Sequence, residues 1–87
     1  LGNFLEYTLG SRESVAGALA VGPDGRVWFT DTGQQLIRAL TWFGEATKVK
    51  IPVSEPYGIV AGPDHAIWFT EMPDVIGRID LRKEWKN

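Results

Sequence analysis

Short runs of alternating apolar and polar residues follow one another along the chain, separated by Gly, Pro and Asp turn residues. No window of eleven or more residues carries the apolar spacing of a capped amphipathic helix. Runs rich in β-branched and aromatic residues predict strands instead. The predicted strands are residues 4–9, 18–21, 26–31, 36–41, 45–51, 57–61, 66–71 and 75–81. The pattern therefore predicts an all-β protein.

One stretch of this pattern returns forty residues later. Residues 21–31 read VGPDGRVWFTD, and residues 61–71 read AGPDHAIWFTE. The match extends outward to four further pairs: Ser14 with Ser54, Leu19 with Ile59, Leu36 with Ile76, and Arg38 with Arg78. A period of about forty residues with short strands and Pro-Asp turns is typical of β-propeller blades. The sequence thus predicts one two-blade propeller unit over residues 1–87.

Each repeat supplies an inner, a second and a third strand of a four-stranded blade, the first over residues 14–53 and the second over 54–87. Residues 45–51 give the first blade its outer strand, and no outer strand is predicted after residue 81. Residues 4–9, inside a predicted closing segment 1–10, resemble residues 46–51. The alternation of Phe4, Tyr7 and Leu9 places apolar residues on one face only imperfectly, because the spacing breaks between Phe4 and Tyr7. A bulge or a shift of register near Leu5 could reconcile it.

Two blades alone would leave two broad apolar faces in water, and stacked repeats generally need three or more units. We therefore expect the chain to complete a closed propeller by homo-oligomerisation. A trimer with six blades is preferred and a tetramer with eight is next. Residues 4–9 are expected to pair as the outermost strand on the second blade of a neighbouring copy, which would cover an open sheet edge.

Composition narrows the function classes. An apolar content of 44% is ordinary for a globular chain, and a net charge of −2 with scattered basic residues predicts no nucleic-acid partner. No apolar run is long enough to predict a membrane span. With no cysteine, the chain has no disulfide framework and its compartment stays unknown. A start at Leu1 leaves open a processed, trimmed or engineered piece.

Glu71 and Asp31 hold the same place in the two repeats and would form a circle of carboxylates in a ring. Both are candidate metal ligands, because carboxylate oxygens suit Mg²⁺ or Ca²⁺. The alternative is a strand-end carboxylate that accepts hydrogen bonds from turn amides or pairs with Arg38 or Arg78. This alternative is the favoured one.

Three aromatic residues are candidate ligand contacts. Tyr57 lies at the mouth of an inner strand, where a small ligand in the central channel would meet a ring with a polar tip. Trp42 and Trp85 lie near the connections after third strands and could stack on sugar rings. Each could instead be buried between blades or chains. His65 replaces Gly25 in a turn, which predicts an exposed position without a metal role.

Four segments carry a resemblance to a known family: PYGI at 56–59, GPD at 62–64, IWFTE at 67–71 and IGRI at 76–79. They resemble the blade signature of the streptogramin B (virginiamycin B) lyase family. The resemblance covers about seventy residues and implies a seven-bladed propeller, soluble and cytoplasmic. It also implies an activity, the Mg²⁺-supported opening of a cyclic depsipeptide antibiotic by elimination.

The resemblance implies a catalytic glutamate directly after W-F-T, which is Glu71, with Asp31 as its counterpart. It implies a catalytic histidine directly after the Pro that enters an inner strand. Tyr57 and Gly17 stand there instead. Neither can serve as a base near neutral pH, because the reference pKa of Tyr is about 10 and Gly has no side chain.

Three functions therefore stay open from the sequence. The favoured one is a structural, self-assembling two-blade module without a catalytic site, for which no cofactor is expected. The second is a fragment of a streptogramin B lyase, which would use Mg²⁺. The third is a lectin-like propeller that binds carbohydrate.

Overall fold

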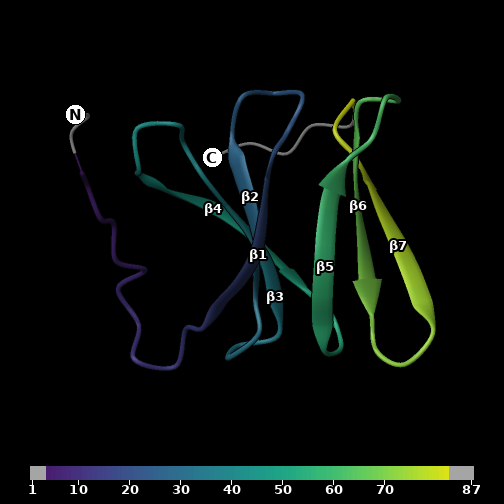
Figure 1. Ribbon diagram of the computed structural model, residues 1–87, viewed down its shortest axis with the longest axis horizontal. Helices are drawn as coiled ribbons and strands as arrows, with labels where there is room; N and C mark the ends of the chain where they lie inside the picture. Colours follow the sequence, from purple (N-terminus) through teal and green to yellow (C-terminus); the bar gives the residue numbers. More distant parts are fainter. Residues whose placement is uncertain (1–3, 83–87) are drawn as a thin grey trace.

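The structure, a computed structural model, describes residues 4–82 and places them in two antiparallel sheets (Figure 1). The first sheet consists of β1 (Ala16–Val21), β2 (Val27–Asp31), β3 (Leu36–Leu40) and β4 (Ala46–Pro52), hydrogen-bonded in that order. The second consists of β5 (Pro56–Ala61), β6 (Ala66–Glu71) and β7 (Val75–Asp80). Between residues 4 and 82 there is no helix, and so none that could span a membrane. The all-β prediction is confirmed, and these seven strands match their predicted ends to within two residues.

The turn between the first two strands of each blade has the same structure in both repeats, as it has a similar sequence. Gly22 N donates to the carbonyl of Arg26 at 2.8 Å, and the indole nitrogen of Trp28 donates to Asp24 Oδ1 at 3.2 Å. The tryptophan edge passes so close to Gly22 that a Cβ there would meet the ring at 2.7 Å. The second blade repeats these contacts with Gly62, Asp64 and Trp68. The repeated letters therefore encode one hairpin whose aspartate holds its tryptophan in place.

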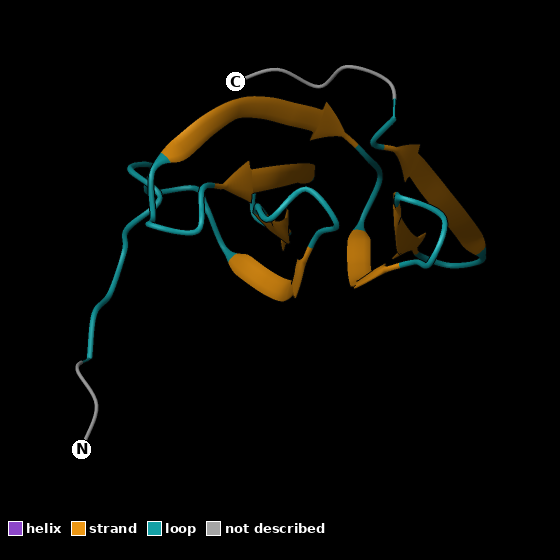
Figure 2. Ribbon diagram, turned by 90° about the horizontal axis from the view of Figure 1, so that it is seen from above, coloured by secondary structure: helices purple, strands orange, loops and turns teal. Residues whose placement is uncertain are grey.

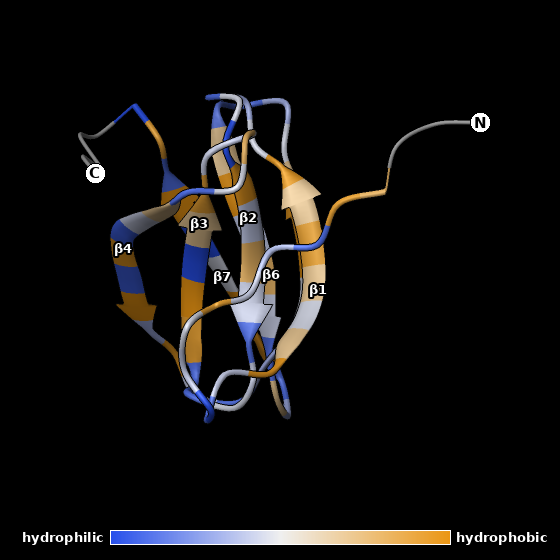
Figure 3. Ribbon diagram, turned by 90° about the vertical axis from the view of Figure 1, so that its left-hand side faces the viewer, coloured by the Kyte–Doolittle hydropathy of each residue, from blue (hydrophilic) through white to orange (hydrophobic). Residues whose placement is uncertain are grey.

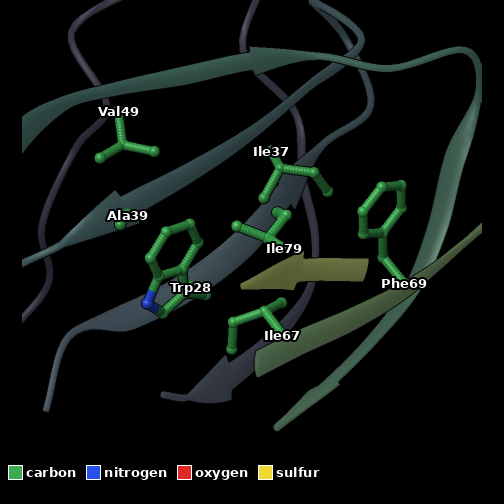
Figure 4. Close-up of a cluster of buried hydrophobic side chains, with 7 residues drawn as sticks. All are labelled: Trp28, Ile37, Ala39, Val49, Ile67, Phe69 and Ile79. Atoms are coloured by element: carbon green, nitrogen blue, oxygen red, sulfur yellow. The ribbon is translucent and has the colours of Figure 1, made fainter. Parts of the chain in front are cut away.

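The core lies between the facing sides of the two sheets, which stand side by side when viewed from above (Figure 2). Trp28 of β2 is fully buried there and lies near Ile67 of β6 (Figure 4). The buried apolar cluster consists of Trp28, Ile37, Ala39, Val49, Ile67, Phe69 and Ile79. Full burial of one large apolar side chain contributes about 1.5–3 kcal/mol. One shared apolar layer therefore joins the two blades.

The hairpins β2–β3 and β6–β7 differ in register by one residue. Asp31 pairs with Leu36 in the first blade, which leaves four residues in the turn. Glu71 pairs with Val75 in the second, which leaves three. A shift by one residue moves every following side chain of the strand to the other face.

The register difference corrects one inference from the repeat. Arg38 and Arg78 match in sequence, but Arg38 lies opposite Phe29 whereas Arg78 lies opposite Trp68. The spatial counterpart of Arg78 is Ala39, which lies opposite Trp28. The two arginines consequently stand on different faces of their blades.

Residues 4–9 form no strand within this single chain. They run in front of the side of the first sheet that points away from the second (Figure 3). The ring of Tyr7 lies against Gly44 in the β3–β4 turn, too close for any side chain there. Their predicted pairing involves a second chain and stays a prediction.

Candidate functional site

Asp31 ends β2 and is completely buried, with both carboxylate oxygens occupied by protein donors. Oδ1 accepts from the backbone nitrogens of Val15 at 3.0 Å and Gln34 at 3.2 Å. Oδ2 accepts from Ser14 Oγ at 2.8 Å and from Arg38 Nη1 at 3.1 Å. Asp31 thus forms hydrogen bonds with three separate segments: the connection before β1, the β2–β3 turn and Arg38 of β3.

These contacts set the protonation of Asp31. Burial opposes ionisation, but the hydrogen bonds from Val15 and Ser14 and the Arg38 guanidinium outweigh it. Together they hold the pKa of the Asp31 carboxyl below its ordinary value near 3.8. The side chain is therefore ionised at neutral pH and paired with a buried arginine. The alternative predicted for Asp31, hydrogen bonding to turn amides and pairing with Arg38, describes this geometry.

Glu71 occupies the same place in the second blade but has a different environment. Its Oε2 accepts from the backbone nitrogen of Ser54 at 2.5 Å, and the side chain is only half-buried. It lines a hollow of about 390 Å³ between the end of β4 and β7. The lining residues are Ile51, Pro52, Val53, Phe69, Glu71, Arg78, Ile79 and Asp80. The equivalent carboxylates therefore do not share an environment.

Arg78 does not pair with Glu71 as the sequence suggested. Its Nε donates to Asp64 Oδ2 at 2.9 Å, and its guanidinium lies 5.7 Å from the centre of the Trp68 ring. The hydrogen bond from Arg78 lowers the pKa of the Asp64 carboxyl. This ion pair is the direct result of the one-residue register difference in β7.

The predicted ligand contacts fall at opposite ends of the molecule. Tyr57 is 71% exposed and lies beside Pro56, the pairing partner of Glu71, at the lower end of β5 in Figure 1. Trp42 is 77% exposed in the β3–β4 turn at the upper end, where its ring meets Phe43 edge-on at 5.2 Å. Trp85 lies outside the described residues. Ligand contact by Tyr57 or Trp42 stays a prediction.

Metal binding by Asp31 and Glu71, expected from a circle of carboxylates in an assembled ring, stays a prediction. Four protein donors surround the oxygens of Asp31, and Glu71 lies in a separate hollow. Over residues 4–82, no group of three or more His, Cys, Asp or Glu side chains is placed to hold a metal ion. His65 is exposed in its turn, as predicted, and has a left-handed φ of 59° where Gly25 has 84°.

The sequence predicted two exposed apolar faces but did not say which residues form them. On the outer side of the first blade, Tyr7, Leu9, Leu19 and Phe29 border a hollow of about 190 Å³. On the outer side of the second blade, a hollow of about 310 Å³ includes Trp68 in its lining. Two exposed residues beside that tryptophan are Val60 and Ile76. The alternation along each strand was the signal that could have named them, because residues i and i+2 share a face.

Comparison with solved structures gives two matches, both to virginiamycin B lyase from Staphylococcus aureus. The selenomethionine-substituted enzyme is 33% identical, with a TM-score of 0.81 over 95% of this chain and 29% of the other. A catalytically inactive variant with quinupristin is 25% identical, with a TM-score of 0.70 over 95% of this chain and 32% of the other. The chain thus spans about three-tenths of the length of these structures. No curated protein sequence matches it.

The match to a family model extends over the whole chain. The model is that of the virginiamycin B lyase family, and it covers residues 1–87. The chain belongs to the virginiamycin B lyase family and forms a two-blade section of its propeller.

Proposed function

We propose that the chain is a structural two-blade module that completes a propeller ring with copies of itself. One observation carries the proposal: each bare end face repeats a face that is buried between the two blades. On the seam within the chain, the Trp28 side of the first blade packs against the Phe69 side of the second. The outer faces are the Trp68 side, with Val60 and Ile76 exposed, and the Phe29 side, where Leu19 is 66% exposed although Phe29 itself is buried. These are the forty-residue counterparts of the packed pair.

The two bare faces are therefore matched to each other and not to themselves. Stacking the Trp68 side of one copy on the Phe29 side of the next would repeat the packing of β2 against β6 seen inside the chain, with Arg78 standing where the inner face has Ala39. Such a head-to-tail contact is heterologous, and it closes into a ring when the rotation between copies permits. Three copies give six blades and four give eight, so a trimer is preferred and a tetramer is next.

The first prediction is a mass in solution of three or four times 9.7 kDa. The reason is the apolar area left on two sides of the single chain, since patches of this kind mark interaction surfaces. Light scattering coupled to size-exclusion chromatography measures the mass directly. A monodisperse 9.7 kDa particle that melts cooperatively contradicts the module.

A lyase piece is the second candidate, favoured by the likeness to virginiamycin B lyase and to its inactive variant with quinupristin. We expect the chain with Mg²⁺ to open a streptogramin B antibiotic no faster than background. Tyr57 and Gly17 stand at the position where the resemblance implies a catalytic histidine, and neither is a histidine. Chromatography of the antibiotic measures the opening. Turnover that disappears in Glu71→Ala would support the lyase candidate instead.

A further inference from the structure

The outer edge of β7 is open within the described residues. In the first blade the corresponding strand, β3, pairs along its outer edge with β4. In the second blade, β7 is the last strand of the sheet among residues 4–82. An unpaired edge presents a row of backbone donors and acceptors that another strand can occupy.

β4 shows what a strand at this position looks like. Thr47 and Val49 are buried and Ile51 is half-buried, whereas Lys48 and Lys50 between them are exposed. The odd positions therefore cover the Trp28 side of the first blade, and the even positions face solvent. This alternation follows from the period of two along a strand.

Residues 4–9 carry the same alternation. Aligned with residues 46–51, they place Leu5, Tyr7 and Leu9 at the buried positions of β4. Glu6 and Thr8 then stand at the exposed ones. The pattern that was broken with Phe4 as an inward residue becomes regular once the odd positions are inward. Neither a bulge nor a register shift is required.

We propose that residues 4–9 of one copy pair antiparallel with the open edge of β7 of the next copy. The inference rests on the proposed self-assembly and names the segment that closes each seam. In the first blade Thr30 pairs with Ile37, which pairs with Ile51. The second blade pairs Thr70 with Ile76, so the same register sets Leu9 of one copy opposite Ile76 of the next.

Packing favours this register. Ile76 is 71% exposed and borders the hollow beside Trp68, so Leu9 would cover apolar surface that is otherwise wet, and Tyr7 would lie opposite Arg78. The segment now lies over the first blade, at the other end of the molecule from β7 in Figures 1 and 2. Residues 10–15 reach at most about 20 Å when extended, which is enough to lead from β1 to an adjacent blade.

The test uses intermolecular disulfides, because the chain has no cysteine of its own. The variant Leu9→Cys/Ile76→Cys is oxidised and run on a denaturing, non-reducing gel. We expect a ladder of covalent multimers, since only cysteines with adjacent, facing Cβ atoms can be bridged. The matched control, Thr8→Cys/Ile76→Cys, places one thiol on the opposite face and should give at least tenfold less product. Equal yields from the two variants overturn the proposed register.

Removal of residues 1–9 gives a second readout that needs no cysteine. The truncated chain should lose the assembled mass of the full chain, because its β7 edges stay open. An assembled full chain whose truncated form keeps the same mass overturns the strand exchange and leaves the module standing. A full chain that is monomeric overturns the module itself, so the two failures are distinguishable.

Discussion

Replacing Asp31 with asparagine should lower the free energy of unfolding by about 3–5 kcal/mol, because it leaves a buried charge without its partner. Arg38 is almost fully buried, and its ion pair at 3.1 Å is with Asp31. The hydrogen bonds from Ser14 and the Val15 amide would weaken with the loss of charge. Urea denaturation followed by tryptophan fluorescence measures the change.

Glu71→Gln is the matched control, since it makes the same chemical change at the same place in the other blade. Glu71 is half-buried and accepts from the Ser54 amide, and an amide oxygen can accept that bond too. We expect a loss below about 1 kcal/mol. Similar losses for the two variants would show that the Asp31 network is not a special support of the fold.

The same network predicts acid sensitivity. The pKa of Asp31 is lower in the folded chain than its ordinary value near 3.8. Its stabilising effect is therefore complete above that ordinary value and disappears as the pH falls through the lower folded pKa. The Asp31→Asn variant should lose less stability than the parent across this acid range, which denaturation at a series of pH values would reveal.

Val60→Lys should weaken self-association at least about a hundredfold without unfolding the chain, because a cation buried at a seam costs several kcal/mol and each 1.4 kcal/mol is a factor of ten. Val60 is 59% exposed on the Trp68 side of the second blade. The new lysine would lie on the same face of the blade as Arg78, which carries the same charge and cannot neutralise it. The dissociation constant comes from sedimentation at a series of concentrations.

Met72→Lys controls for charge and for loss of an exposed apolar side chain. Met72 is 51% exposed in the β6–β7 turn, away from the linings of the two bare faces. We expect its assembly to equal that of the parent. If both variants assemble like the parent, the Trp68 side is not the seam.

The strands were predictable from the sequence because the repeat marks each run twice and Gly-Pro-Asp turns separate the runs. The register of β7 against β6 could not be predicted from the sequence. The letters align Arg38 with Arg78 at a spacing of forty, but Pro73 replaces Gly33 and the turn closes with three residues instead of four. A turn shorter by one residue changes which side chains face the core, and no letter match reports it.

The candidate site illustrates the same limit. Asp31 and Glu71 were correctly recognised as equivalent strand-end carboxylates, yet one is enclosed by four donors and the other borders an open hollow. The difference depends on where the arginine of the third strand points, which follows from the register. Sequence equivalence therefore predicts position on the backbone better than it predicts environment.

The position of Arg78 makes it a gatekeeper residue. Without it, Val60, Trp68 and Ile76 would form a continuous apolar patch on the outer side of the second blade. The guanidinium over Trp68, balanced by Asp64, discourages indiscriminate association with any apolar surface that the chain encounters. A partner must leave that ion pair hydrated or supply its own polar group beside it. The short β6–β7 turn thus helps a chain with a bare blade face to discriminate between partners.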